Sequence, residues 1–310
     1  MSFSNEVRNE VARYIPDKPC CRKSELASLL LFAGQVEKTA NGQLLKITVE
    51  NAATARKIYQ YVKEFSPWPA TVESEAKNRF RKSRAYDVVI EPKDSDKEVL
   101  EEMGLLYPTA RRHAPWNLLG KSCCRRSFIR GLFLTRGFIN RPEGNYHLEL
   151  VLGDTRLAAE VQKLLQKMGL KAGCIERKNH LVVYLKDSEK IADFLRLIGA
   201  SKALLDFENA RILKSMRNTV NRQVNCETAN LVKTIDASVR QVELMEKLIQ
   251  SQRWEMLSPQ LKELAMVRLK YPDSTLKELG EMLNPPLSKS GAAYRMRKLE
   301  QTAEELLDQN

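Results

Sequence analysis

The sequence has little of what marks a secreted or membrane protein. Residues 1–6 contain no basic-then-apolar signal peptide, and no stretch approaches the roughly 18 uninterrupted apolar residues that span a bilayer. No low-complexity block typical of disorder occurs. The 310 residues, 43% of them hydrophobic, therefore predict a soluble cytoplasmic protein of two or three domains, with no membrane partner.

Acidic side chains are scarce in two segments. Lys and Arg outnumber Asp and Glu by 51 to 39, and residues 111–141 hold eight basic side chains and no acid, while 77–84 hold five and no acid. Such single-sign patches are typical of a polyanion partner, although one run alone is more often a solvated face. Two runs in one chain favour a nucleic-acid partner.

Fifteen consecutive residues occur twice in similar form. The segment 20–34, CCRKSELASLLLFAG, is matched 103 residues later by 123–137, CCRRSFIRGLFLTRG. Each copy opens with an apolar helix that holds a small residue, Ser28 or Gly131, and ends at a glycine. We therefore expect two closely packed helices related by a pseudo-twofold axis.

Strand periodicity follows the helix in both copies. Residues 44–49 and 147–152 alternate apolar and polar side chains, the pattern of a half-buried strand. After an amphipathic helix, a second strand pair is expected at about 70–76 and 84–90, and again at about 172–176 and 181–185. Each copy thus predicts the order αββαββα, with a first repeat and N-terminal helix over 1–105 and a second repeat over 106–218.

The six cysteines include two adjacent pairs, and the histidines number only three. Cys20-Cys21 and Cys123-Cys124 take equivalent positions in the two copies, so a metal ion shared between the copies is one alternative. No CxxC spacing or neighbouring histidine supports it, and adjacent cysteines bridge only with strain. We expect small buried thiols in a reducing cytosol, no metal ion and no other cofactor.

Basic residues gather at the tips of the second hairpin in each copy. They are Lys77, Arg79, Arg81, Lys82 and Arg84 in the first copy, and Arg177 and Lys178 in the second. Lys and Arg at such places bind phosphates, which positions a protein on DNA without reading bases. The polar strand faces carry Lys46 in one copy but Glu149 in the other, so we expect base reading there to be weak and asymmetric.

A stretch rich in asparagine follows the second copy. Five asparagines occur between Asn209 and Asn230, and their side chains compete with the backbone for hydrogen bonds. We therefore expect a hinge near 218–230, within a linker over 219–257 whose later part is an amphipathic helix.

Residues 258–310 predict a helix-turn-helix domain. Helices are expected at about 258–270 and 275–283, and Ser288 begins a last helix to about 307. The inward stripe of that helix is Ala292, Met296, Leu299 and Ala303. The opposite face suits the major groove of DNA and consists of Ser288, Lys289, Ser290, Ala293, Tyr294, Arg295, Arg297 and Lys298. A helical hairpin with a solvated basic face is the alternative.

The segment 26–34 and its copy resemble the helix that names the LAGLIDADG homing endonucleases. In that family the helix pair builds a DNA-cradling saddle, and an acid just before the last glycine of each helix holds the metal ions for cleavage. Here those positions are Ala33 and Arg136, which supply no oxygen ligand for Mg²⁺. Glu25 precedes the helix body, and neither it nor Glu37 has an acidic counterpart in the other copy, so we expect no catalytic residue and no enzyme activity.

Three further segments carry a second resemblance: the asparagine-rich stretch 208–233, the helix 276–280 and the segment 285–291. With the domains above, they resemble the WhiA family of bacterial transcription regulators over essentially the whole chain. The resemblance implies an α+β fold, with a duplicated αββαββα LAGLIDADG-like saddle followed by an all-α helix-turn-helix domain. It also implies sequence-specific binding of double-stranded DNA at the nucleoid, with roles in cell division, chromosome segregation or sporulation.

Other functions stay open at this point. They are a nuclease with relocated metal ligands, an RNA-binding splicing cofactor of the LAGLIDADG type, and a nucleoid or division scaffold that uses the saddle for protein contact. Another regulator or a division protein is a further expected partner, and no small-molecule substrate is expected. Tyr294 stands where the resembled family often has histidine, so the target DNA sequence is left open.

Overall fold

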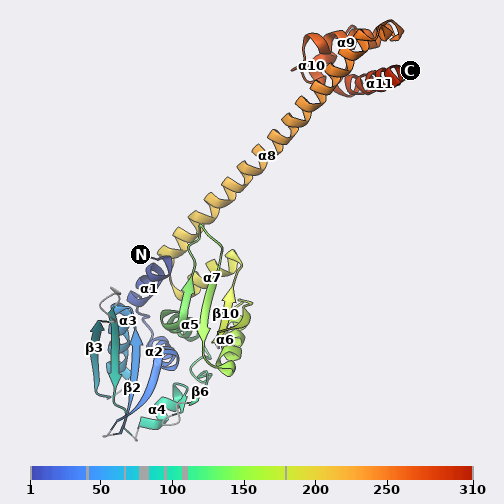
Figure 1. The fold of residues 1–310 in the computed structure, drawn as a ribbon. Helices are drawn as coiled ribbons and strands as arrows, with labels where there is room; N and C mark the ends of the chain where they lie inside the picture. Colours follow the sequence, from blue (N-terminus) through green and yellow to red (C-terminus); the bar gives the residue numbers. More distant parts are fainter. Residues whose placement is uncertain are drawn as a thin grey trace. The chain divides into compact units, whose positions relative to one another are not determined.

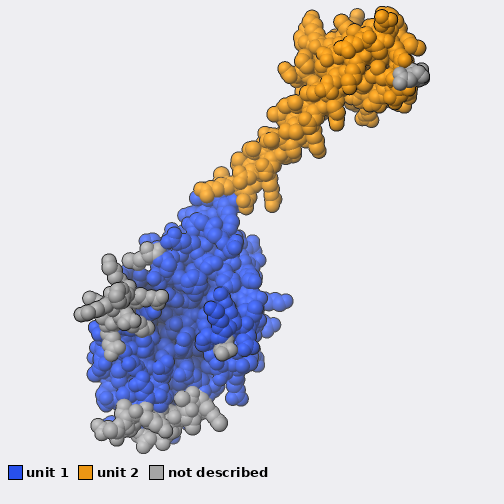
Figure 2. Space-filling model, in the orientation of Figure 1, with its two compact units in different colours: residues 1–215 blue, residues 216–310 orange. Residues whose placement is uncertain are grey.

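The computed structural model describes residues 2–39, 42–65, 68–76, 84–93, 96–106, 111–178 and 180–308. The chain forms two compact units, residues 1–215 and residues 216–310, which are coloured separately in Figure 2. Each unit has its own hydrophobic core. Among the described helices, none combines the length and the apolar composition that crossing a membrane requires.

The first unit contains two copies of one motif. The first copy comprises α2 (Pro19–Ala33), β1 (Gly34–Thr39), β2 (Gly42–Val49), α3 (Ala52–Phe65), β3 (Ala70–Ala76), β4 (Arg84–Ile90) and α4 (Lys97–Glu102). The second copy comprises α5 (Ser122–Arg136), β7 (Gly137–Ile139), β8 (Leu148–Leu152), α6 (Thr155–Lys167), β9 (Gly173–Arg177), β10 (His180–Leu185) and α7 (Ser188–Ile198). The αββαββα duplication expected from the sequence is therefore confirmed.

Each copy contains one four-stranded antiparallel sheet, and the two sheets have matching strand orders (Figure 1). The orders are β1-β2-β4-β3 and β7-β8-β10-β9. Alternate side chains of the central strands are buried, as the period of two predicts. These are Leu45, Ile47 and Val49 in β2, and Leu148, Leu150 and Leu152 in β8. The α+β class is confirmed.

α2 and α5 pack side by side and supply much of the core of the first unit. A Cβ atom added to Gly131 would lie 2.8 Å from the Cβ atom of Ser28 and 2.8 Å from the carbonyl oxygen of Glu25. Ser24 Oγ donates to the carbonyl oxygen of Cys124 at 2.9 Å. Small residues at equivalent positions thus let the two helices approach closely, as expected.

Shorter elements complete the first unit. α1 (Phe3–Arg13) buries Val7 and Val11 and packs against α3 and α5. The ring of Phe3 stacks on that of Phe207 with centroids 6.4 Å apart, which ties α1 to the start of α8 (Ser201–Gln250). β5 (Leu105–Leu106) and β6 (Arg111–Arg112) form a small antiparallel pair in the connection between the two copies.

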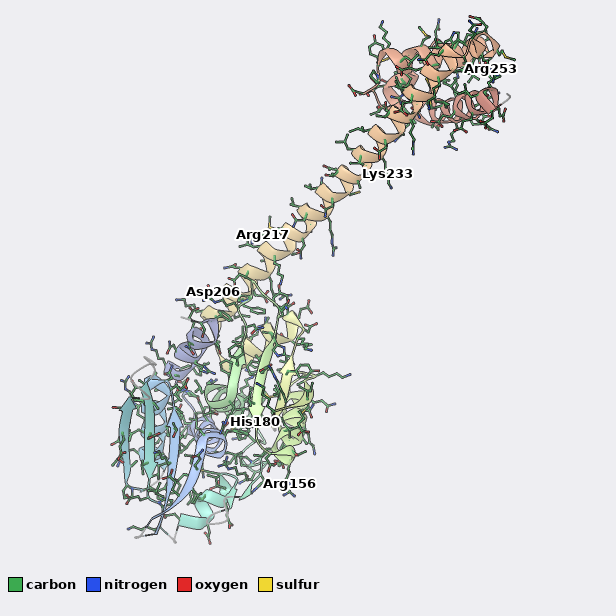
Figure 3. All side chains as sticks on the ribbon, viewed as in Figure 1. Arg156, His180, Asp206, Arg217, Lys233 and Arg253 are labelled. Carbon is green, nitrogen blue, oxygen red and sulfur yellow. The ribbon has the colours of Figure 1, made fainter. Side chains whose placement is uncertain are left out.

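The asparagine-rich stretch belongs to α8, which runs without a break from Ser201 to Gln250. The hinge expected near 218–230 does not occur. Residues 201–250 contain no proline or glycine, and asparagine costs a helix less than about 1 kcal/mol per residue relative to alanine. Side chains of residues 215–233 are exposed, as Figure 3 shows for the labelled Arg217 and Lys233, and the helix is continuous through them.

The second unit combines the end of α8 with η2 (Arg253–Met256), α9 (Pro259–Lys270), α10 (Leu276–Glu281) and α11 (Lys289–Asp308). The last three lie close to the helix bounds expected from the sequence. Met245 and Leu248 of α8 are buried in the core of this unit, whereas Leu231 and Ile235 are exposed. Only the final turns of α8 therefore use the amphipathic pattern for packing within the unit.

Candidate nucleic-acid interface

One face of α11 is buried in the core of the second unit. Its buried residues are Ala292, Met296, Leu299 and Ala303, the stripe expected from the spacing. At the start of the helix, the backbone N–H of Gly291 donates to Ser288 Oγ at 3.2 Å, which confirms the N-cap. On the flank of the stripe, Gln241 of α8 donates to Glu300 Oε1 at 2.7 Å. These contacts fix the rotation of α11 about its own axis.

The opposite face of α11 is polar, basic and accessible. Its exposed residues are Ser288, Lys289, Ser290, Tyr294, Arg297 and Lys298. Ala293 is half-buried, and Tyr294 is 69% exposed. Arg295 differs, because its half-buried side chain places Nη1 4.0 Å from Glu263 Oε2 of α9. Arg295 therefore packs against its own unit, and the other seven expected residues reach the surface.

Two side chains that the sequence did not single out hold the turn between α9 and α10. Arg268 Nη1 donates to the carbonyl oxygens of Pro272 at 3.1 Å and Ser274 at 2.7 Å. Ser238 of α8 donates to the same Pro272 oxygen. Burial lowers the pKa of Arg268, and the charge of Glu300 partly offsets this effect. The turn is thus anchored from both α8 and α9.

α10 and α11 approach closely at Gly280. A Cβ atom at this position would lie 2.6 Å from the carbonyl oxygen of Leu287 and 3.1 Å from the Cβ atom of Ala292. α10 itself begins with a capping box in which Thr275 and Glu278 each bind the backbone of the other. The absence of a side chain at Gly280 therefore lets α10 and α11 approach this closely.

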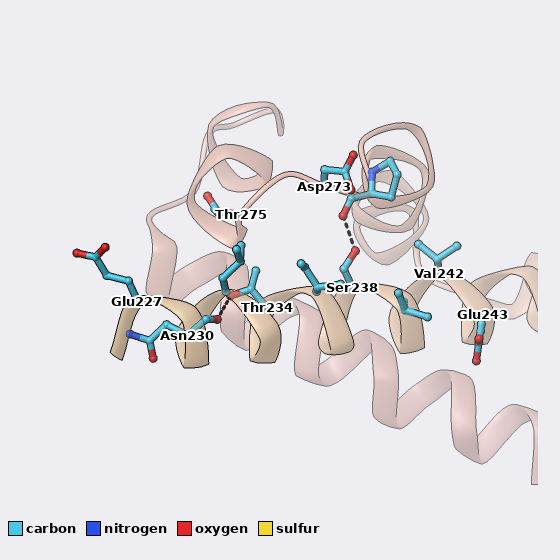
Figure 4. A pocket seen from close by; sticks show the side chains of 12 residues that line it. Glu227, Asn230, Thr234, Ser238, Val242, Glu243, Asp273 and Thr275 are labelled. Atoms are coloured by element: carbon cyan, nitrogen blue, oxygen red, sulfur yellow. Dashed lines mark hydrogen bonds between the residues drawn. The ribbon is translucent and has the colours of Figure 1, made fainter. Parts of the chain in front are cut away.

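An open apolar hollow of about 620 Å³ lies between α8 and the turn before α10 (Figure 4). Its apolar lining includes Leu231, Ile235 and Val239 of α8 and Pro272 of the turn. Its polar lining includes three carboxylates, those of Glu227, Glu243 and Asp273, and no basic side chain contributes to it among the described residues. This surface does not suit nucleic-acid phosphates.

The C-terminal ends of α2 and α5 carry positive charge where the nuclease family has metal-binding acids. Ala33 is buried at the end of α2, and Arg136 Nε donates to the carbonyl oxygen of Phe32 at 2.8 Å. The Arg112 guanidinium donates to the carbonyl oxygen of Gly34. Burial and then the nearby charge of Arg136 lower the pKa of Arg112. Two neighbouring guanidinium groups attract an anion such as phosphate and repel Mg²⁺.

Both carboxylate oxygens of Glu25 take part in a buried ion-pair network. Glu25 lies inside α2 and not before it, because the helix begins as early as Pro19. Its Oε1 accepts from Lys57 Nζ at 2.7 Å, and its Oε2 accepts from Arg130 Nη1 at 3.1 Å. Glu37 is exposed on β1. Glu25 therefore has a structural role and is not a relocated metal ligand.

The exposed faces of the two sheets differ. In the first sheet, Lys46 Nζ lies 3.0 Å from Asp87 Oδ2, and Thr48 donates to Asp87 Oδ1 at 2.7 Å. In the second sheet, Phe138 pairs with Glu149 across β7 and β8, and Phe138 is 43% exposed. One face thus has its lysine paired with a carboxylate, and the other is partly aromatic.

The hairpin tips are described only in part. β3 pairs with β4 from Ala70 and Ile90 to Ala76 and Arg84, and the expected contact residues Lys77, Arg79, Arg81 and Lys82 lie outside the described residues, as does the side chain of Arg84. In the second copy, Arg177 and Lys178 are exposed at the tip, and Arg177 Nη1 lies 3.7 Å from Glu149 Oε1.

Comparison with known proteins agrees with this architecture. The model of the WhiA N-terminal LAGLIDADG-like domain matches residues 19–106, that of the WhiA LAGLIDADG-like domain matches 125–217, and that of the WhiA C-terminal HTH domain matches 220–303. A Syntrophomonas wolfei protein named probable cell division protein WhiA is 55% identical over 320 residues, covering 100% of both chains. One of the same name from Desulforudis audaxviator is 47% identical, covering 99% of this chain and 98% of the relative.

A solved structure extends the agreement to three dimensions. Full-length DUF199/WhiA from Thermatoga maritima superposes with a TM-score of 0.60 at 25% sequence identity, covering 98% of this chain and 99% of that one. The domain matches, the relatives similar over their whole length and the solved structure agree with the two αββαββα copies and the helix-turn-helix unit described above. The chain therefore belongs to the WhiA family.

Proposed function

We propose that this chain is a sequence-specific DNA-binding transcription regulator linked to cell division, chromosome segregation or sporulation. The observation that carries the proposal is the exposed face of α11, with small hydroxyl residues at its start and Arg297 and Lys298 further along. A helix of this kind fits the major groove of DNA, which is about 12 Å wide. The place of action is the cytoplasm, at the nucleoid.

Within α11, two basic residues have different roles. Arg297 is exposed to one side of the face opposite the buried stripe, and its planar guanidinium can donate two hydrogen bonds to a base edge, most favourably that of guanine. Lys298 is exposed to the other side of that face, and its ammonium group, a point charge without a fixed fork of donors, suits phosphate. Arg297 therefore contributes to discrimination between sequences, and Lys298 contributes to affinity for any sequence.

The first unit adds contacts to the DNA backbone. We assign phosphate binding to Arg177 and Lys178, which are exposed at one hairpin tip, and to Arg112 and Arg136, which lie at the ends of the central helices. Lys77, Arg79, Arg81, Lys82 and Arg84 at the other tip belong to the same proposal. Such contacts strengthen binding without selecting a sequence.

The same unit does not cleave DNA. Hydrolysis by the route of the resembled nucleases needs carboxylates at positions 33 and 136, where a methyl group and a guanidinium stand. Purified chain incubated with duplex DNA and Mg²⁺ or Mn²⁺ should leave it intact. Metal-dependent nicking that copurifies with the chain and disappears in Glu37→Gln, a change of an exposed side chain, would assign nuclease activity to it.

A division or nucleoid scaffold is the second candidate function. Curated relatives carry the name probable cell division protein, and the second sheet exposes apolar side chains, with Ile175 at 56% and Phe138 at 43%. Such a patch fits contact with another regulator or a division protein. An RNA-binding splicing cofactor would not need a C-terminal unit, and the match of residues 220–303 to a helix-turn-helix model favours the regulator.

Sequencing of DNA that coprecipitates with the tagged full chain separates these functions. Discrete peaks at promoters support a regulator, and they should fade in Arg297→Ala while total DNA recovery falls much less. Uniform coverage of the chromosome, unchanged by Arg297→Ala, would support the scaffold instead.

A further inference from the structure

Four of the six cysteines form a cluster at the N-terminal ends of α2 and α5. Cys20 and Cys21 lie in the first turn of α2, and Cys123 and Cys124 lie in the first turn of α5. Because these helices lie in parallel, their first turns meet, and the four Sγ atoms all lie within 4.8 Å of one another. Cys21 and Cys124 are buried, Cys123 is half-buried and Cys20 is exposed, so only two thiols are buried as expected.

The separations within this cysteine cluster fit one tetrahedral metal ion. With metal–sulfur bonds of about 2.3 Å, as for zinc, the sulfurs of a regular tetrahedron lie about 3.8 Å apart. The observed upper limit of 4.8 Å therefore needs a contraction of about 1 Å, within the reach of small side-chain rotations. An iron–sulfur cluster places several atoms between its thiolates and needs a wider space. Four sulfur ligands in tetrahedral geometry are typical of structural Zn²⁺.

The charges around the cluster are an independent observation that points to an anionic site. A helix N-terminus is partly positive, so its N-cap is usually Ser, Thr, Asp or Asn, and acids are favoured in its first turn. α2 and α5 instead have Lys18 and Lys121 as N-caps, with no side-chain cap and no acid in the first turn. Positive groups at two adjoining positive helix ends repel each other unless an anion lies between them. Four thiolates around one divalent cation carry that excess of negative charge.

The protonation of the buried thiols does not oppose coordination. Burial, followed by contacts with the other cysteines, raises the pKa of Cys21 to about 11 and that of Cys124 to about 12. A coordinated metal ion removes the proton from a thiol, so these groups become ligands when the ion binds. Ser24 supports the cluster by donating to the carbonyl oxygen of Cys124 at 2.9 Å.

We propose that the cysteine cluster binds one Zn²⁺ ion as a four-thiolate site that joins the two repeats. Each repeat supplies two ligands, so the ion links α2 to α5 directly. Four protein ligands leave no open position for a substrate, which makes the site structural. Ala33 lies 12 residues along α2 from Cys21, roughly 18 Å at 1.5 Å per residue, so this site is separate from the lost nuclease metal position.

Metal analysis of the full chain purified with a thiol reductant tests the proposal. One zinc ion per chain is expected by elemental mass spectrometry. Metal-free chain titrated with Co²⁺ should develop the visible d–d bands and the near-ultraviolet thiolate-to-cobalt bands of a tetrahedral four-sulfur site, with an end point at one equivalent. This spectrum reports the ligands of the wild-type chain, so it does not depend on any variant folding.

Single serine substitutions then assign the ligands. Cys20→Ser and Cys123→Ser should each weaken Zn²⁺ binding at least tenfold in competition with a chromophoric chelator. Cys174→Ser and Cys226→Ser remove the two cysteines outside the cluster and should bind as the wild type does. Wild-type chain with far less than one zinc and no four-sulfur cobalt spectrum would overturn the proposal, as would equal losses in all four variants.

Discussion

Replacing Glu25 by Gln should destabilise the first unit far more than the loss of a surface ion pair does. The Glu25 side chain is 0% exposed, and its partners Lys57 and Arg130 are 2% and 5% exposed. Lys57 Nζ also donates to the carbonyl oxygen of Val11 at 2.9 Å, and Arg130 Nε donates to that of Ile198 at 2.7 Å. The carboxylate is thus the counter-charge for two buried cations that tie α1, α3, α5 and α7 to α2.

The magnitude follows from the two cations that remain. Breaking a buried ion pair by removing one partner costs about 3–5 kcal/mol, because the other charge stays desolvated. The Gln side-chain oxygen still accepts a hydrogen bond, so we expect the free energy of unfolding to fall by about 4 kcal/mol. Glu64→Gln is the matched control, since the Glu64–Arg22 pair lies 2.7 Å apart with both side chains partly exposed and should contribute about 0–1 kcal/mol.

Urea unfolding measured by tryptophan fluorescence provides the comparison. In a Trp254→Phe background, the remaining Trp68 and Trp116 both report on the first unit. Circular dichroism before the titration establishes that each variant is folded. If Glu25→Gln lost no more free energy of unfolding than Glu64→Gln, the carboxylate would not be balancing two buried charges and the reasoning would be refuted.

Three further changes test packing and the division of labour. Gly131→Ala places a Cβ atom 2.8 Å from atoms of α2 and should cost the first unit about 1–3 kcal/mol in the same titration, whereas Gly153→Ala, where a Cβ meets nothing within 4 Å, should cost less than about 0.5 kcal/mol. Arg268→Ala removes a buried guanidinium and leaves the part-buried carbonyl oxygen of Ser274 without its donor, so it should destabilise the second unit by about 1–3 kcal/mol, read from Trp254, while exposed Lys270→Ala should change little. The fragment 216–310 should keep the sequence preference of the full chain, bind more weakly and show a shallower salt dependence, because each lost phosphate contact removes roughly one unit of the log–log slope. Equal binding of preferred and random DNA by the fragment would place base reading in the first unit.

The duplication made the first unit predictable from the sequence. A short apolar run such as Leu45 to Val49 is ambiguous alone, but its counterpart 103 residues later repeats the alternation, and both proved to be central strands. The buried stripe of α11 was predictable for a similar reason, because its spacing of three to four residues fits only one helix face. A pattern of apolar residues that repeats along the sequence is therefore a more reliable predictor of an element than a single short run.

Other features could not be predicted from short sequence patterns. The hinge prediction was wrong because it considered only the competition of asparagine side chains for backbone hydrogen bonds and not the good helix formers around them, and α8 is continuous. Arg268 continues the core spacing of Leu261, Leu264 and Ala265, so the sequence did indicate that it is buried. Only the geometry of the turn shows that its guanidinium binds backbone carbonyl oxygens. The cysteine cluster fails every local spacing rule, since its ligand pairs meet only through the packing of α2 on α5.

Titration of wild type, Arg297→Ala and Lys298→Ala against a preferred and a scrambled duplex, at several salt concentrations, tests sequence reading by α11 most directly. Arg297→Ala should cost about 1–3 kcal/mol on the preferred duplex and little on the scrambled one, which flattens discrimination. Lys298→Ala should weaken both duplexes by similar factors and reduce the salt slope by about one. Equal losses on both duplexes for Arg297→Ala would contradict base reading by this face of α11.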